Sequence, residues 1–256
     1  MDRGYVLHTY PYRETSLILQ VWTEKHGRLG LVAKGARRPR SPSRSVLVPF
    51  QPLALDWFGR GELRTLKTAE PAVPAIPLGG ASLLSAFYLN ELLLKLTTRD
   101  DPHEGLFAAY DTAIASLRAL SRPNTSHGVS EDLPQSPRGV EPVLRRFELS
   151  LLQELGYAVE LAREAGGHRP IEAGCDYWYI VERGPVRADG EDAPPNAIRL
   201  SGQTLMDLYR GHFESAVTAS QSKQLMRLLI HHSLNGQELA TRSLVRDLQR
   251  IDGEAP

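Results

Sequence analysis

The chain has 256 residues, of which 41% are hydrophobic, enough for one large domain or two smaller ones. A membrane span needs about 20 mostly apolar residues, and charged side chains interrupt even the longest apolar stretch, LLSAFYLNELLLKL. MDRGYVLHTY has no apolar signal-peptide core, so we expect a cytoplasmic location. Cys175 is the only cysteine, which excludes an internal disulfide and a multi-cysteine zinc site.

The first seventy residues contain short runs rich in β-forming residues. Strands are predicted at Tyr5–Thr9, Ser16–Thr23, Leu29–Ala33, 53–58 and Leu63–Thr68. Glycine and proline separate these runs, which is typical of a small antiparallel barrel or sandwich. Five strands in about 70 residues favour an OB-type barrel, a fold that often binds single-stranded nucleic acid.

The segment PAVPAIPLGG, residues 71–80, continues neither a sheet nor a helix because proline and glycine interrupt it. We therefore predict an OB-fold domain over 1–78, a mainly helical domain over 79–256, and an α+β fold overall. Apolar periodicity and capping residues predict helices at about 82–97, 101–117, 142–155, 203–209, 219–234 and 238–250.

Two parts of the predicted helical domain lack helical periodicity. Residues 121–140 are polar and rich in Ser, Pro and Gly, which predicts a mobile loop. Within 160–190, the runs Tyr177–Val181 and Pro185–Ala188 predict a small β-hairpin.

Positive charge is concentrated near the N-terminus. The 30 basic and 30 acidic residues balance overall, but residues 1–70 carry a net charge of +6 and the remainder −6. Residues 25–44, called the basic segment below, contain no Asp or Glu and seven cations: Lys25, Arg28, Lys34, Arg37, Arg38, Arg40 and Arg44.

The basic segment leaves an apolar strand and enters a stretch rich in proline and serine, which predicts a flexible loop that follows a phosphate backbone. The alternative is a solvated loop that only aids solubility. Candidate rings for stacking on bases are Tyr5, Tyr10, Tyr12, Trp22, Trp57 and Phe58, each of which can instead belong to the core.

Sequence motifs of catalysis are missing. The chain contains no GxxxxGK[ST] or GxGxxG phosphate loop, no GxSxG and no HExxH. Its eight histidines show no metal-ligand spacing with carboxylates. We therefore expect no enzymatic activity, no cofactor and no metal. An enzyme with a nucleophile or metal site outside these patterns stays open as an alternative.

Two predicted helices carry further basic side chains. Arg145 and Arg146 lie near Leu149, and basic groups beside an apolar groove suit a short peptide ending in acidic and aromatic residues. A stripe at four-residue spacing in the last predicted helix is a candidate second nucleic-acid contact: Arg242, Arg246 and Arg250. A solvated helix face is the alternative for both sets.

Several segments together resemble the RecO family of bacterial recombination mediators, which act in the RecF pathway. These are VLHTYPYRETSLILQVWTEKHGRLGLVAKGARRPRS, FYLNELLLKL, DPHEGLFAAY, LRRFELSLLQELGY, SGQTLMDL and GQELATRSL. Their order and spacing carry a resemblance that runs nearly end to end. It implies an N-terminal OB-fold, a helical C-terminal domain, binding of single- and double-stranded DNA, and annealing of complementary strands.

The resemblance also implies partners and a location. The expected partners are RecR and the acidic C-terminal tail of the single-stranded-DNA-binding protein (SSB), with loading of the RecA recombinase as the outcome. The family's tail-binding site in the helical domain implies the candidates Phe107, Arg145, Arg146 and Leu149. We expect a cytoplasmic, nucleoid-associated protein.

Zinc is not expected in this chain. Many members of the family carry a four-cysteine zinc module after the LGY segment, whereas this chain has only Cys175 there. It therefore resembles the zinc-free proteobacterial branch. An RNA-binding OB module with a helical assembly domain is the alternative function, which competition between DNA and RNA oligonucleotides would distinguish.

Overall fold

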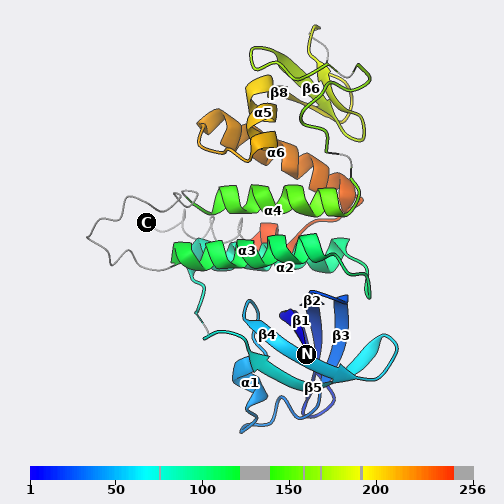
Figure 1. The fold of residues 1–256 in the computed structure, drawn as a ribbon, viewed down its shortest axis with the longest axis vertical. Helices are drawn as coiled ribbons and strands as arrows, with labels where there is room; N and C mark the ends of the chain where they lie inside the picture. Colours follow the sequence, from blue (N-terminus) through cyan, green and yellow to red (C-terminus); the bar gives the residue numbers. More distant parts are fainter. Residues whose placement is uncertain (75, 122–138, 158, 168, 191–192, 245–256) are drawn as a thin grey trace, which may run out of the picture. The chain divides into compact units, whose positions relative to one another are not determined.

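The computed structural model describes residues 1–74, 76–121, 139–157, 159–167, 169–190 and 193–244 (Figure 1). The predicted mobile loop at 121–140 lies almost entirely outside the described residues. Packing divides the chain into two compact units, residues 1–127 with 239–256 (unit 1) and residues 128–238 (unit 2). The predicted boundary at residue 78 separates strands from helices within unit 1, and the division into 1–78 and 79–256 stays a prediction.

Unit 1 begins with a closed five-stranded barrel, as predicted. Its strands follow the order β1-β2-β3-β5-β4 around the barrel: β1 (Asp2–Tyr12), β2 (Ser16–Thr23), β3 (Gly27–Ala33), β4 (Pro52–Phe58) and β5 (Leu63–Pro71). The pair β3–β5 is parallel, and the other neighbouring pairs are antiparallel. This five-stranded barrel confirms the OB-fold prediction.

Alternation along the strands separates the barrel interior from its outer face. Leu19 and Val21 of β2 and Leu29 and Leu31 of β3 lie in the barrel core, each with at most 1% of its surface exposed. Because successive side chains of a strand point to opposite faces, the residues between them lie on the outer face. The side chains on that outer face are therefore the ones that a ligand or a packed helix contacts.

Two helices of unit 1 pack side by side (Figure 1), α2 (Gly80–Leu96) and α3 (Glu104–Ser121). The sequence predicted α2 within two residues, but α3 begins at Glu104 and not directly after the predicted cap Asp101. Asp101 instead accepts a hydrogen bond from Thr98 Oγ1 at 3.1 Å and lies 3.3 Å from His103 Nε2.

A buried asparagine joins β1, α2 and α3. Asn90, which is 2% exposed, donates to the carbonyl of Leu7 at 2.8 Å and accepts from the hydroxyl of Tyr110 at 2.6 Å. Beside it, Asp111 of α3 accepts hydrogen bonds from Arg3, at 2.6 Å, and from the hydroxyl of Tyr5. Burial and the hydrogen bond to Asp111 raise the pKa of Tyr5, so the phenol stays a neutral donor.

The described residues of unit 2 form three helices and a small sheet. The helices are α4 (Val140–Glu154), α5 (Gly202–Arg210) and α6 (Ala216–Ser233), and the strands are β6 (Asp176–Ile180), β7 (Gly184–Arg187) and β8 (Ala197–Ser201). The predicted hairpin is β6–β7. The sheet order is β7-β6-β8, so β8 adds a third strand that the sequence did not predict.

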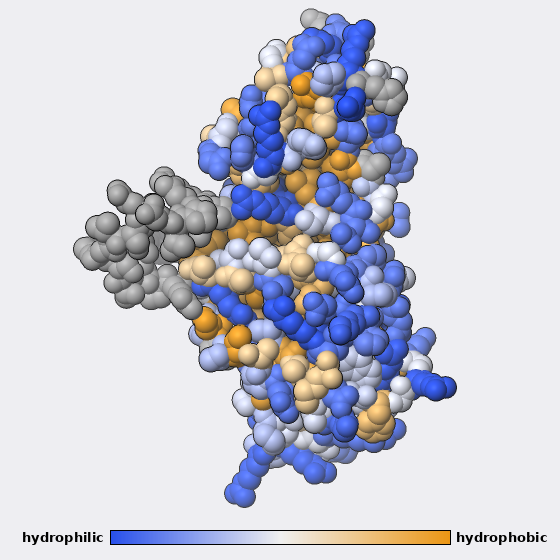
Figure 2. Space-filling view, viewed as in Figure 1, coloured by the Kyte–Doolittle hydropathy of each residue, from blue (hydrophilic) through white to orange (hydrophobic). Residues whose placement is uncertain are grey.

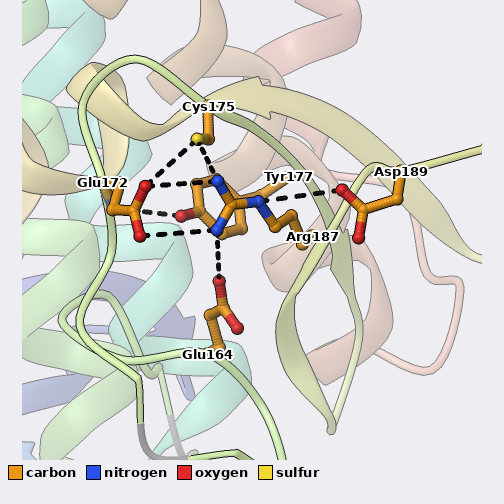
Figure 3. A network of polar contacts seen from close by, with 6 residues as sticks. All are labelled: Glu164, Glu172, Cys175, Tyr177, Arg187 and Asp189. Carbon is orange, nitrogen blue, oxygen red and sulfur yellow. Dashed lines mark hydrogen bonds and ion pairs between the residues drawn. The ribbon is translucent and has the colours of Figure 1, made fainter.

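One arginine joins the segment before β6 to β7 (Figure 3). Arg187 donates to Glu172 Oε2 at 3.2 Å and to the thiol of Cys175 at 2.6 Å, and lies 3.8 Å from Glu164 and 3.7 Å from Asp189. Hydrogen bonds from Arg187 and Cys175 lower the pKa of Glu172. A guanidinium at the centre of these acidic groups therefore connects two segments of the small sheet region through charged hydrogen bonds.

Replacing Asn90 should destabilise the packing of the barrel on its helices. We expect Asn90→Ala to lower the free energy of unfolding by about 2–4 kcal/mol, because the buried Leu7 carbonyl loses its donor and a cavity remains. Chemical denaturation monitored by fluorescence measures this change. Tyr110→Phe removes only one of the two hydrogen bonds and should cost about 1 kcal/mol. If Asn90→Ala lowered the free energy of unfolding by no more than Tyr110→Phe does, the proposed role of Asn90 would be contradicted.

The Arg187 network should contribute stability that depends on pH. Because the folded-state pKa of Glu172 is lowered, its contribution is present above the unfolded pKa of about 4.3 and disappears as pH falls through the folded value. Glu172→Gln should therefore lower the melting temperature at pH 7, and the difference from wild type should shrink in acid. Glu70→Gln, at an exposed carboxylate outside the network, is the control. A constant difference from pH 7 to pH 3 would argue against the network.

Candidate nucleic-acid interface

The fold divides the basic segment between the two ends of β3. Lys25 lies in the turn between β2 and β3, whereas Lys34 and the arginines beyond it follow the other end of the strand. Seven residues at about 3.3 Å each separate the two ends by roughly 20 Å. The seven predicted cations therefore do not form one patch. Those of 34–44 are exposed together: Lys34, Arg37, Arg38, Arg40 and Arg44.

Residues 34–47, called the basic loop below, fold as a chain of turns that ends in the one-turn helix α1 (Ser43–Val46). Arg38 N donates to Gly35 O at 3.1 Å, Ser41 N to Arg38 O at 3.0 Å, and Arg44 N to Ser41 O at 3.2 Å. The sequence predicted a flexible loop and did not predict these turns or α1.

The basic loop is anchored at both ends by buried side chains. Ala36 and Leu47 are 1% and 5% exposed and belong to the barrel core. In the view of Figure 2 the surface over the barrel is mostly hydrophilic, with long hydrophilic side chains projecting near α1 and its adjoining loop. Two anchors therefore hold the loop backbone on the barrel while its cationic side chains extend into solvent.

A further arginine that the sequence did not single out joins this end of the barrel. Arg37 N donates to the carbonyl of Thr15 at 2.8 Å, which ties the basic loop to the turn between β1 and β2. Arg13 lies in that turn, is exposed, and places its guanidinium 5.2 Å from the ring centre of Tyr12. Only the packing of the two turns shows this proximity, because Arg13 lies outside the basic segment in sequence.

Arg28 is held differently from the other six cations. It lies on the outer face of β3, where its guanidinium donates to Thr97 O at 2.7 Å and to Gln20 Oε1 at 3.4 Å. Burial and the nearby Arg99 lower the pKa of Arg28, which remains a cation at neutral pH. Arg28 therefore fastens the barrel to the end of α2 in addition to contributing charge.

The candidate stacking rings separate into buried and exposed groups. Tyr5 and Trp22 are at most 1% exposed and belong to the packing of unit 1. Tyr10 and Phe58 are 47% and 57% exposed, so their rings are accessible from solvent. Among the predicted aromatic candidates, these two are the most exposed.

The candidates on α4 of unit 2 have distinct environments. Arg145 is buried, and its Nη1 lies 2.8 Å from Glu148 Oε2, so a carboxylate balances its charge. Arg146 is exposed, donates to Gly211 O at 3.0 Å at the C-terminal end of α5, and lies 5.5 Å from the ring centre of Phe213. Leu149 is 8% exposed. Only Arg146 presents an accessible cation here.

Phe107 belongs to unit 1, whereas the candidates on α4 belong to unit 2. It is 1% exposed, with its ring centre 6.0 Å from that of Tyr5, so the ring serves the contact between barrel and α3. Arg242 also lies in unit 1, 5.8 Å from the ring centre of Tyr88. Residues 240–244 are helical, and Arg246 and Arg250 lie outside the described residues.

Within the described ranges, no three or more His, Cys, Asp or Glu side chains are grouped so that they would hold a metal ion. No helix in the same ranges is long and apolar enough to cross a bilayer.

The barrel, the basic loop and the neighbouring β1–β2 turn define an OB-fold protein with a surface suited to a polyanion. Comparison with known proteins narrows this class. Residues 1–74 match the family model "Recombination protein O N terminal", and residues 131–242 match "Recombination protein O C terminal". Together the two models cover most of the chain.

Individual relatives agree over nearly the full length. DNA repair protein RecO of Azoarcus sp. (strain BH72) is 49% identical over 97% of this chain and 96% of its own. The proteins of that name from Aromatoleum aromaticum and Nitrosospira multiformis are 46% and 44% identical, each covering 97% of this chain and 95% of their own. The chain belongs to the RecO family of DNA repair proteins, which supports a role in DNA repair and recombination.

Proposed function

We propose that this protein binds single- and double-stranded DNA through the basic loop and the neighbouring β1–β2 turn, and anneals complementary strands. The observation that carries the proposal is the group of exposed cations at one end of an OB barrel. Among the described residues, no carboxylate forms an ion pair with Lys34, Arg38, Arg40 or Arg44. These charges are therefore available to phosphates.

The proposed mechanism is electrostatic. Lysine and arginine side chains neutralise backbone phosphates and release counterions, which gives affinity that falls steeply with salt. Two complementary strands repel each other through their phosphates, so a shared cationic surface lowers the repulsion and lets their bases pair. Phosphate contacts carry no base sequence, which suits a protein that anneals any complementary pair.

Partner contacts complete the proposal. We propose that the protein acts with RecR and SSB to load RecA, and that it is nucleoid-associated in the cytoplasm. Arg146 is the preferred contact for the acidic SSB tail, because it is exposed whereas Arg145 is paired with Glu148. Arg242, Arg246 and Arg250 stay secondary candidates for DNA. An RNA-binding role remains the second candidate, since phosphates alone do not distinguish RNA from DNA.

Reversing charge in the basic loop should weaken DNA binding. The triple variant Arg37→Glu, Arg38→Glu, Arg40→Glu should bind a single-stranded oligonucleotide at least tenfold more weakly at low salt, with a shallower salt dependence, because fewer phosphates are neutralised. Fluorescence anisotropy at several salt concentrations measures both effects. Arg183→Glu, Arg210→Glu, Arg227→Glu in unit 2 is a control of equal charge. Unchanged affinity and slope would exclude the basic loop as the DNA site.

Arg146→Ala should weaken binding of a peptide that copies the SSB tail by about 5- to 10-fold and leave the affinity for naked DNA unchanged. The physical reason is the loss of one charged hydrogen-bond donor for the peptide's carboxylates. Fluorescence anisotropy with labelled peptide and labelled DNA compares the two. Arg227→Ala, at an exposed arginine of α6, is the control. Wild-type peptide affinity in Arg146→Ala would place the tail site elsewhere.

A further inference from the structure

Unit 1 contains a cleft on the outer face of the barrel, apart from the basic loop, and both polar and apolar side chains line it. Its volume is about 480 Å³, within the roughly 300–1,000 Å³ typical of small-ligand sites. Strands β1, β2 and β3 form its floor, and the end of α2 and the β4–β5 loop form its sides. Its polar and charged lining residues are Tyr10, Gln20, Arg28, Glu62 and Arg99, and three apolar side chains complete the lining.

Partial cover by the helices creates this cleft. At one end of β1, the ring of Tyr5 packs against Phe107 and Tyr110 of α3, with ring centres 6.0 and 5.1 Å away, and is buried. Further along the same strand, Tyr10 is 47% exposed. The packing of α2 and α3 on the barrel thus leaves one end of the β1 outer face open.

The cleft carries unbalanced positive charge. Arg28 and Arg99 face the same space, and the repulsion between them contributes to the lowered pKa of Arg28. Arg28 Nε is buried and has no hydrogen-bond partner among the described residues. Among the described residues, Glu62 is the one acidic residue lining the cleft; its side chain is 91% exposed and lies 3.9 Å from Arg99 Nη1. Nearby Asp100 is engaged by Arg64.

An accessible aromatic ring borders these arginines. The ring of Tyr10 packs edge-on against that of His8, with centres 4.4 Å apart, which orients it while half of the side chain remains exposed. A nucleobase can stack on such a ring whatever its sequence, with about 1–3 kcal/mol per base. Tyr10 also lies close to the end of β1 at Tyr12, and Arg13 follows in the turn that is tied to the basic loop, which gives a short path to that loop.

We propose that this cleft holds one nucleotide of a single strand, with its phosphate between Arg28 and Arg99 and its base on Tyr10. This inference rests on the proposed DNA binding and specifies how a single strand is held. The path to the basic loop favours a nucleic acid over an acidic peptide. A base inside a duplex stays stacked on its neighbours, so the ring of Tyr10 serves single strands.

Glu62 acts as a competing anion in this arrangement. Its carboxylate approaches Arg99 from the exposed β4–β5 loop and must give way before a phosphate binds. Removing its charge should therefore strengthen binding, an effect opposite in sign to that of removing an arginine. The gain should exceed that of Glu70→Gln, which changes the net charge equally at an exposed carboxylate outside the cleft.

The test uses the full-length protein and a fluorescein-labelled oligothymidine, with anisotropy as the readout. Arg99→Gln should weaken binding about 5- to 10-fold. It should also reduce, by about one, the slope of the logarithm of the binding constant against the logarithm of the salt concentration. Tyr10→Leu should weaken single-strand binding about tenfold and duplex binding less than twofold. Glu62→Gln should tighten single-strand binding about 2- to 5-fold. Arg227→Gln is the control, and circular dichroism checks the fold of each variant.

A second readout locates the base directly. An oligonucleotide carrying 5-iodouracil should crosslink to Tyr10 on irradiation, and mass spectrometry of the digested product identifies the residue. This measurement uses the wild-type chain, so it remains decisive if a substituted variant does not fold. Crosslinks confined to other residues would overturn the placement of the base.

The outcomes separate this inference from the proposed function. If Arg99→Gln, Tyr10→Leu and Glu62→Gln all bind as wild type while the basic-loop triple variant is weakened, the cleft is not a nucleotide site and DNA binding stands. If the wild-type chain binds no DNA, both proposals fail. If Arg99→Gln weakens only an SSB-tail peptide, the cleft is a peptide site and the nucleotide inference is wrong.

Discussion

The hydrogen bonds of Asn90 are the constraint on which unit 1 depends. One side-chain amide satisfies a carbonyl of β1 and a hydroxyl of α3 in a position that water does not reach. A buried polar group is tolerated only when it is hydrogen-bonded, so this residue permits one arrangement of strand and helices and penalises others. The same contact between β1 and α3 is reinforced by Asp111 of α3, whose carboxylate accepts hydrogen bonds from Arg3 and Tyr5 of β1.

This arrangement decides which parts of the barrel are accessible. By covering the outer face at Tyr5 and leaving it open at Tyr10, the helices create the cleft and bring Arg99 to Arg28. The basic loop is held differently, by the buried side chains of Ala36 and Leu47, which fix its backbone to the barrel core. The cationic surface of unit 1 is therefore built in two places by two kinds of contact.

Much of the fold could be predicted because its signals are local. The five barrel strands and the hairpin β6–β7 have β-rich runs bounded by glycine or proline, and α2 has a clear apolar face. β8 was missed because its run, AIRLS, is short and follows a proline-rich stretch, and its pairing with β6 joins segments that are separate in sequence. Phe107 shows the same limit, since helical spacing identifies an apolar face but not the aromatic ring that it meets.

By itself, the sequence determined the OB barrel, the concentration of cations before residue 45 and the resemblance to the RecO family, because these depend on composition, short-range pattern and the order of motifs. Only the tertiary structure decided which charges act together. It separated Lys25 from the basic loop by the length of β3, neutralised Arg145 with Glu148, and brought Arg13 to the loop and Arg99 to Arg28. Electrostatic interaction depends on distance and burial, and folding sets both through contacts between residues far apart in the chain.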